Sequence, residues 1–291
     1  MRIIDNFRKR INKQSIKDIN PSIILFGGGQ SEAKKPYYHY CHDWLQDFFS
    51  RNLTNRENIL FISWAIWGGH DADKMFSYGQ EHWGQFGLNL KALHKAKNMT
   101  KEIEEADAII VGGGSVHMLV RELENNRLMM PLRKKIESGC LYIGTSAGSV
   151  ICGPTMHTAS EPPLIHIPSH KTLGVVPFQI NAHYYDNDPD AFHHGPTPAT
   201  RLKNYLLLNP NPKPVVCIRD GSYLRINGGK VEVMGIHPVT VFGTDMQRYD
   251  FSPGSYIDSI LDTKSVYYQR GINSSLLREH RLVGILAGRL G

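Results

Sequence analysis

The stretch that decides the fold is Leu141-Tyr142-Ile143-Gly144-Thr145-Ser146-Ala147-Gly148-Ser149-Val150-Ile151. Its first three residues form an apolar run, which predicts a buried strand. The small residues that follow predict a sharp turn, and the last two residues predict the opening of a helix. A strand, a tight turn with a central serine and a helix make up a nucleophile elbow, in which the serine hydroxyl projects above the edge of a sheet.

The glycines of this turn agree with an elbow. Gly144 and Gly148 stand where a Cβ atom would collide with neighbouring backbone. The backbone N–H of Ala147 would then point at the carbonyl oxygen under attack and supply half of an oxyanion hole. The alternative is a glycine-rich turn that binds a phosphate or only reverses the chain. The pattern alone leaves both interpretations open.

Length and composition indicate an ordinary globular protein. The chain has 291 residues, of which 41% are hydrophobic and 21% charged, enough for one large domain or two small ones. No apolar run approaches the roughly 20 residues that cross a bilayer, and the N-terminus lacks the apolar core of a signal peptide. The four cysteines are scattered without a Cys-x-x-Cys pair, which is typical of reduced thiols in a cytosolic protein. We therefore expect a cytoplasmic protein that does not bind membranes.

The positive charge lies at the two ends of the chain. The net charge is +6; residues 1–19 carry +4 and residues 264–291 carry another +4, which leaves −2 for the body between them. A nucleic-acid-binding protein needs a basic face on its folded body, so we expect no nucleic-acid partner. The basic ends are better explained as solvated tails.

Strand-like and helix-like segments alternate along the first half of the chain, which predicts a parallel sheet with helices on both faces. A hairpin is predicted later, around Asn227-Gly228-Gly229. The predicted strands are 22–26, 58–63, 86–90, 108–111, 141–143, 173–183, 214–218, 223–226, 230–234 and, as the last of the body, 239–242. The predicted helices are 37–51, 72–84, 116–125, 128–138, 199–208 and 275–286.

The expected organisation is a basic arm over 1–20, a single α/β catalytic domain over 21–249 and a tail with a helix over 250–291. Three strands end in small or glycine-rich turns, namely 27–30, 112–114 and the elbow. In parallel sheets the carboxyl ends of the strands meet at one edge, where ligands bind. These turns are therefore expected around one crevice.

A serine needs a base, and a carboxylate usually orients that base. His183 ends an extended run and Asp220 ends the next strand, so both are expected at the same edge of a sheet as Ser146. These residue types at three strand ends indicate a catalytic triad. The alternatives are a structural histidine at 183 and a turn-forming aspartate before Gly221.

Three segments together resemble the dipeptidase E (α-aspartyl dipeptidase) and cyanophycinase family of serine peptidases. They are Ile110-Val111-Gly112-Gly113-Gly114, Leu141 to Gly148, and Gln179-Ile180-Asn181-Ala182-His183-Tyr184, in that order. Pro154-Thr155 and the turn 219–223 also fit, and the resemblance spans roughly residues 22–245. It implies a flavodoxin-like fold related to class I glutamine amidotransferases, with serine where those enzymes have cysteine.

The resemblance also implies roles for individual residues. Ser146 would be the nucleophile and His183 the general base, while Gly113 or Gly114, with Ala147, would supply the oxyanion N–H groups.

Two carboxylates compete for the third position of the triad. Asp220 falls where the family has a glutamate; because Asp is one methylene shorter, its strand must come closer or a water must bridge. Glu161 falls at another acidic position of the family and is the second candidate.

Two departures from the family concern the substrate. Aspartyl dipeptidases carry Gly-Glu-Thr-Arg-Glu-x-Arg after the histidine, and the first arginine pairs with the substrate aspartate. Here Pro198 replaces that arginine and only the second, Arg201, remains as a candidate for binding substrate. The glycine loop reads Gly114-Ser115-Val116 instead of Gly-Asn-Thr. An unpaired buried carboxylate is costly, so a strict preference for N-terminal aspartate is not expected.

The expected function is that of a serine peptidase that cleaves an amide bond near the N-terminus of a small peptide. The alternatives are a cyanophycinase-like isopeptide hydrolase and an amidotransferase-like protein that binds a ligand without catalysis. No cofactor and no metal are expected, because His70, Asp71 and Asp73 lack a further ligand at a recognised spacing. Apart from the peptide substrate, the partner that remains possible is a second copy of the chain.

Overall fold

The computed structural model describes residues 22–53, 58–187 and 195–261 of the chain. The expected arm over 1–20 and the expected helix over 275–286 lie outside these residues. None of the described helices is both long and apolar enough to cross a membrane.

The larger of two sheets has seven strands in the order β3-β2-β4-β5-β1-β8-β9. The five strands from β3 to β1 run parallel, and the β8–β9 hairpin adds two antiparallel strands at one edge. The bounds are β1 Ile23–Phe26, β2 Ile59–Ile62, β3 Leu90–Ala92, β4 Ala108–Val111, β5 Leu141–Thr145, β8 Ser222–Asn227 and β9 Lys230–Gly235.

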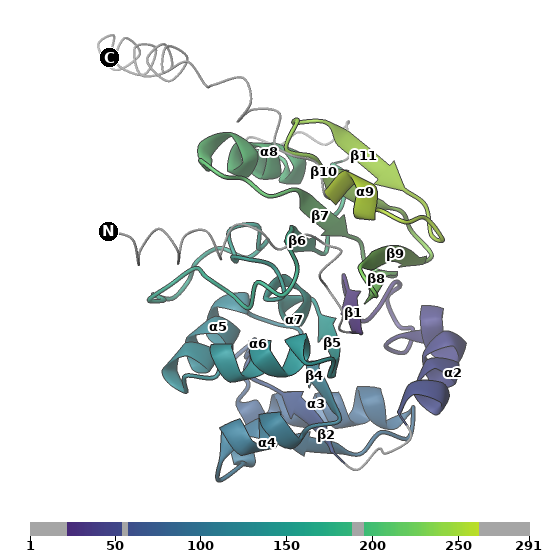
Figure 1. Ribbon diagram of the computed structural model, residues 1–291, viewed down its shortest axis with the longest axis vertical. Coiled ribbons are helices and arrows are strands. Elements are labelled where there is room, and N and C mark those ends of the chain that lie inside the picture. Colours follow the sequence, from purple (N-terminus) through teal and green to yellow (C-terminus); the bar gives the residue numbers. More distant parts are fainter. Residues whose placement is uncertain (1–21, 54–57, 188–194, 262–291) are drawn as a thin grey trace.

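Helices cover both faces of the parallel part of this sheet (Figure 1). α2 and α3 pack their apolar side chains on one face, and α4, α5 and α6 pack on the other. Because both faces are covered, every residue of β1, β2, β4 and β5 is buried. The bounds are α2 His42–Asn52, α3 Ala72–Gly84, α4 Met99–Glu105, α5 Val116–Asn125 and α6 Met129–Glu137, with 3-10 turns η2 His39–Cys41 and η3 Leu93–Lys95.

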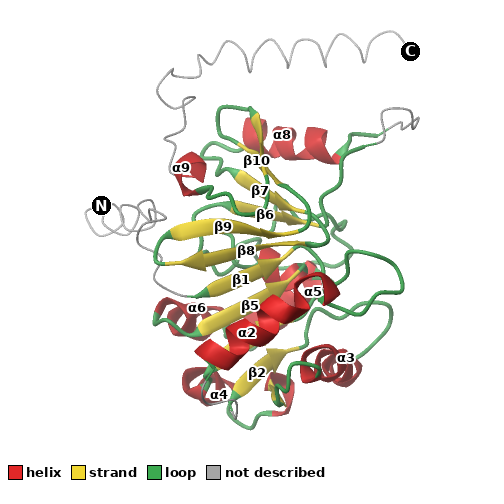
Figure 2. Cartoon of the chain, turned by 90° about the vertical axis from the view of Figure 1, so that its right-hand side faces the viewer, coloured by secondary structure: helices red, strands yellow, loops and turns green. Residues whose placement is uncertain are grey.

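A second sheet of four strands, in the order β11-β10-β7-β6, stands beyond the β8–β9 hairpin (Figure 2). β6 and β7 are parallel neighbours, whereas β10 and β11 are antiparallel. One face of this sheet joins the main apolar core, and α8 covers the opposite face. The bounds are β6 Gln179–Ala182, β7 Val215–Ile218, β10 Val239–Phe242, β11 Arg248–Phe251, α7 Ala147–Val150, α8 Pro198–Leu208 and α9 Asp258–Leu261.

The predicted α/β class is confirmed, as are the mostly parallel sheet with helices on both faces and the hairpin at 223–234. Three details of the prediction are wrong. Of the strand expected over 173–183, only β6 at Gln179–Ala182 is a strand. The strand expected over 86–90 is β3 at Leu90–Ala92, because Phe86 and Leu88 are buried in a turn that leaves α3 through Gly87 at φ 71°. The strand over 239–242 is not the last, since β11 follows it. The expected domain boundary at residue 249 falls inside β11.

Candidate active site

Ser146 lies in a strained turn between β5 and α7. Its backbone has φ 52° and ψ −108°, a region that non-glycine residues adopt at a cost and that is found at functional sites. Its N–H donates to the carbonyl oxygen of Phe26 at 3.1 Å, which anchors the turn to β1. A Cβ on Gly144 would lie 2.5 Å from the carbonyl oxygen of Gly148. The crossing of strand and helix therefore requires glycine, as the sequence pattern predicts.

His183 and Asp220 reach Ser146 from the four-stranded sheet. His183 follows β6 and Asp220 lies just after β7, so their positions at neighbouring parallel strand ends agree with the sequence pattern. His183 Nε2 lies 2.7 Å from Ser146 Oγ, and His183 Nδ1 lies 2.7 Å from Asp220 Oδ1. Both side chains are 48% exposed, so a substrate can reach them. Serine, imidazole and carboxylate thus form one hydrogen-bonded chain.

The shorter carboxylate of Asp220 reaches His183 directly because glycines lie between the two sheets. A Cβ on Gly28 would overlap Asp220 Oδ1 and come within 2.9 Å of His183 Cε1. A Cβ on Gly27 would overlap the carbonyl oxygen of Arg219. The end of β1 therefore lets the end of β7 approach closely, and no bridging water is needed. The sequence pattern predicts this glycine turn at the crevice but carries no signal for this role.

Three backbone N–H groups beside Ser146 are free to bind an oxyanion. Among the described residues, the N–H groups of Gly113, Gly114 and Ala147 donate no hydrogen bond. A Cβ on Gly113 would lie 3.2 Å from Ser146 Cβ, which places this loop against the serine. Gly114 has φ 129°, and its missing Cβ leaves room for the carbonyl oxygen of Ala65. This arrangement suits an oxyanion hole made of backbone N–H groups.

Comparison with known proteins shows the family of this chain. The profile of peptidase family S51 matches residues 23–234. The chain belongs to peptidase family S51. Peptidase E of Streptomyces coelicolor is 34% identical over 84% of this chain and 97% of its own length. A probable alpha-aspartyl dipeptidase of Drosophila melanogaster is 30% identical over 75% of this chain and 88% of its own length. The chain is therefore a serine peptidase.

Solved structures share the fold. A peptidase from an acI-B1 actinobacterium superposes with a TM-score of 0.59 at 19% identity, covering 83% of this chain and 98% of that one. A putative peptidase E from Listeria monocytogenes superposes with a TM-score of 0.54 at 20% identity, covering 74% and 98%. At these identities the likeness concerns the α/β fold alone.

Glu161, the second candidate carboxylate, is hydrogen-bonded to α5 rather than to His183. Its Oε1 accepts from the N–H of His117 at 2.8 Å and from the hydroxyl of Ser115 at 3.1 Å, and it lies 2.6 Å from His117 Nδ1. A carboxylate at this position stabilises the N-terminus of α5. The carboxylate in contact with His183 is Asp220. The pairing of Glu161 with His117 was not anticipated from the sequence.

Two cavities adjoin Ser146, and Arg201 lines neither of them. One has a volume of about 320 Å³ and the other about 430 Å³; both are lined by Ser146, His183, Gly114 and Trp67. Arg201 is exposed on α8. No lysine or arginine is among the described residues that line these cavities. The described part of the chain also contains no cluster of histidine, cysteine and acidic side chains that could hold a metal ion.

The cysteines take no part in the site. Cys41, Cys140, Cys152 and Cys217 are all buried, and none is in a disulfide. Burial raises the pKa of the Cys140 thiol to about 11 and raises the pKa values of the other three thiols as well. They are therefore protonated at neutral pH and are poor nucleophiles.

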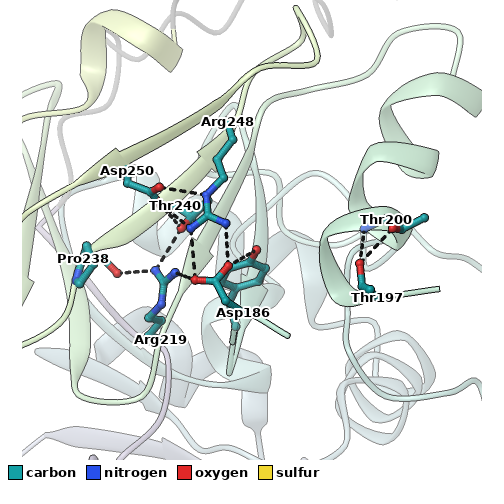
Figure 3. Close-up of polar contacts among 9 residues, drawn as sticks. Asp186, Thr197, Thr200, Arg219, Pro238, Thr240, Arg248 and Asp250 are labelled. Carbon is teal, nitrogen blue, oxygen red and sulfur yellow. Dashed lines mark hydrogen bonds and ion pairs between the residues drawn. The ribbon is translucent and has the colours of Figure 1, made fainter. Parts of the chain in front are cut away.

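An ion-pair network holds the chain just beyond His183 and Asp220 (Figure 3). Asp186 pairs with Arg248 at 2.6 Å and with Arg219, the neighbour of Asp220, at 2.7 Å. Arg219 also donates to Thr240, and Arg248 to Asp250, on β10 and β11. Hydrogen bonds, first from Arg248 and then from Arg219, lower the pKa of Asp186 to about 2. The network ties the segments that carry His183 and Asp220 to one sheet, and the sequence pattern gave no signal for it.

Proposed function

We propose that Ser146, His183 and Asp220 are the catalytic triad of a peptidase that hydrolyses small peptides through an acyl-enzyme. The observation that carries the proposal is the unbroken chain of two 2.7 Å contacts from Ser146 Oγ through the imidazole to Asp220. The carboxylate accepts a hydrogen bond from Nδ1–H, which leaves Nε2 without a proton and able to take the proton of the serine hydroxyl.

Each step then has a group to perform it. His183 Nε2 takes the proton of Ser146 as Oγ attacks the carbonyl carbon of the peptide. The resulting oxyanion accepts hydrogen bonds from Ala147 and from Gly113 or Gly114. The imidazolium passes its proton to the departing amine, and the acyl group remains as an ester on Ser146. A water that His183 deprotonates then attacks this ester and releases the acid.

Strict specificity for aspartate is not part of the proposal. The relatives named peptidase E and probable alpha-aspartyl dipeptidase suggest dipeptides as substrates. In this chain, however, Pro198 stands where an aspartyl dipeptidase has its substrate-binding arginine, and the described lining of both cavities contains no cation. We therefore assign small peptides as the substrate class and leave an acidic side chain out of it.

A fluorophosphonate probe tests the activated serine, because it labels only a serine whose proton is taken by a base. We expect one label on the purified chain, located at Ser146 by peptide mass spectrometry and lost in Ser146→Ala. Ser77→Ala, which changes an exposed serine on α3, is the matched control and keeps the label. An unlabelled wild-type chain would support a ligand-binding protein without catalysis. Hydrolysis of β-aspartyl isopeptides in preference to α-dipeptides would support a cyanophycinase-like enzyme.

A further inference from the structure

The smaller cavity beside Ser146 has aromatic walls. It lies between α3 and the glycine turns that follow β1 and β4, and its volume is about 320 Å³. This volume is at the lower end of the range for ligand sites and is large enough for one big side chain. The rings that line it are Tyr37, Tyr38, Phe61, Trp67, His70, Tyr78, His82 and Trp83, together with the thioether of Met75.

Packing fixes the positions of several of these rings. Tyr37 stacks on His82 with a centroid distance of 3.7 Å and an interplanar angle of 13°. Tyr78 lies nearly parallel to His82, at 10° and 6.4 Å. Phe61 is buried against Gly79 of α3, where a Cβ would lie 2.5 Å from the end of its ring. The walls are therefore preorganised, which lowers the entropic cost of binding an apolar group.

Histidines are the only described lining residues of the cavity that could carry a charge at neutral pH. It is lined by no lysine, arginine, aspartate or glutamate. Burial lowers the pKa of His82, and burial together with the charge of Asp220 raises the pKa of Tyr37, so both rings are neutral. The ammonium of Lys74 lies 4.8 Å from the centroid of the Tyr78 ring, but Lys74 is not among the lining residues.

We infer that this cavity binds an aromatic or large aliphatic side chain of a residue next to the scissile bond, and that it discriminates against aspartate, lysine and arginine there. The inference rests on the proposed function, because it assumes that Ser146 attacks a peptide. An apolar side chain exchanges water for ring contacts, and an aromatic one also gains edge and stacking contacts. An ionised side chain would lose water without finding a counter-ion among the described lining residues.

A panel of dipeptides tests this preference with the wild-type chain. The peptides Phe-Leu, Ala-Leu, Asp-Leu and Lys-Leu vary the first residue, and Leu-Phe, Leu-Ala, Leu-Asp and Leu-Lys vary the second. In one of the two series we expect kcat/KM for the aromatic peptide to exceed that for the alanine peptide by roughly 100-fold, and that for the charged peptides by more. Equal or faster cleavage of the aspartyl or lysyl peptide in both series would overturn the inference.

A cation placed in the cavity should weaken the preference for apolar over acidic side chains. Met75→Arg puts a guanidinium on the lining face of α3, at a half-buried position that can hold its aliphatic stem. We expect the ratio of kcat/KM for Asp-Leu to that for Phe-Leu, or for the mirrored pair, to rise at least tenfold. Gln80→Arg adds the same charge on the exposed side of α3 and should leave the ratio within twofold. An unchanged ratio in folded Met75→Arg would show that the side chain binds elsewhere.

Failure of the inference and failure of the proposed function give different results. If peptides are cleaved but the ratios do not favour apolar side chains, only the role of the cavity is wrong. If no peptide is cleaved and the fluorophosphonate probe does not react, the peptidase mechanism fails and the inference fails with it.

Discussion

The two sheets contribute different parts of the active site, and each sheet is stabilised by a different kind of interaction. The seven-stranded sheet provides Ser146 and the glycine loop, and its parallel strands are buried on both faces. The four-stranded sheet provides His183 and Asp220, and it is fastened at its end by ion pairs around Asp186. Apolar packing fixes the strand that carries Ser146, whereas a polar network fixes the segments that carry His183 and Asp220.

Because Ser146 and His183 come from different sheets, we expect activity to depend most on the contact between the two sheets. The contact is made where the end of β1 touches the end of β7, and Gly28 leaves no room for a side chain there. Changes in either sheet and changes at the contact should therefore have distinguishable effects on rate and on stability.

The largest effect is expected in the seven-stranded sheet. Ser146→Ala removes the nucleophile and should lower kcat for dipeptide hydrolysis by about 10⁴-fold or more. The free energy of unfolding should change little, because within the described part of the chain the serine hydroxyl is hydrogen-bonded only to His183. Steady-state kinetics and urea titration measure the two effects. Turnover that persists within a few-fold would exclude Ser146 as the nucleophile.

The next effect separates the two carboxylates. Asp220→Asn should lower kcat by roughly 10³- to 10⁴-fold, because an amide favours the wrong imidazole tautomer. Glu161→Gln removes a charge from the start of α5 and should cost roughly 1–2 kcal/mol of stability. Its kcat should stay within about tenfold of wild type. The opposite ranking of the two rates would make Glu161 the partner of the base.

The contact between the sheets is tested by adding one methyl group. In Gly28→Ala the new Cβ overlaps Asp220 Oδ1 and presses on His183, so the two must move apart. A displacement of the catalytic groups by about 1 Å lowers kcat/KM by about 100-fold. Gly84→Ala is the matched control, because a Cβ there meets nothing within 4 Å. If both variants retain full activity, the close approach of the two sheets is not required.

The smallest effect concerns the ion pairs of the four-stranded sheet. The pKa of Asp186 is about 2 in the folded chain, below its ordinary value of 3.8. A carboxyl group whose pKa is lowered by folding stabilises the fold when the pH is above its ordinary pKa. This stabilisation is lost as the pH falls from about 4 towards 2. The difference in unfolding free energy between wild type and Asp186→Asn should therefore be constant from pH 7 to pH 5. It should narrow below pH 4, as urea titrations at each pH would reveal. Because Asp186 is half exposed, the difference is small.

The sequence predicted the parts of the molecule that follow from local pattern. The apolar runs of β1, β2, β4 and β5, and the turn at Ser146, are visible because buried strands and tight turns restrict residue type strongly. His183 and Asp220 were found because they end apolar strands. β11 was missed because Arg248–Phe251 is an alternating, half-exposed strand with two charged residues and no apolar run.

What could not be predicted depends on contacts between distant segments. Glu161 is joined to His117 across 44 positions of the chain, and Asp186 to Arg248 across 62. The aromatic cavity draws its rings from several separate segments, so no window of sequence displays it. Arg201 was chosen because it matches the second arginine of the family's motif, but α8 presents it to solvent away from the lining of both cavities.

The division of the site between two sheets also affects the protein while it is being synthesised. A growing chain that ends within the loop after α7 already contains β1, β2, β4 and β5, the strands at and beside the elbow. It still lacks the histidine and the aspartate. Since domains begin to fold from the N-terminus during translation, we expect incomplete chains to carry a formed elbow that cannot act on peptides. Hydrolysis should begin only once translation has passed Asp220, so aborted products should be harmless to the peptide pool of the cell.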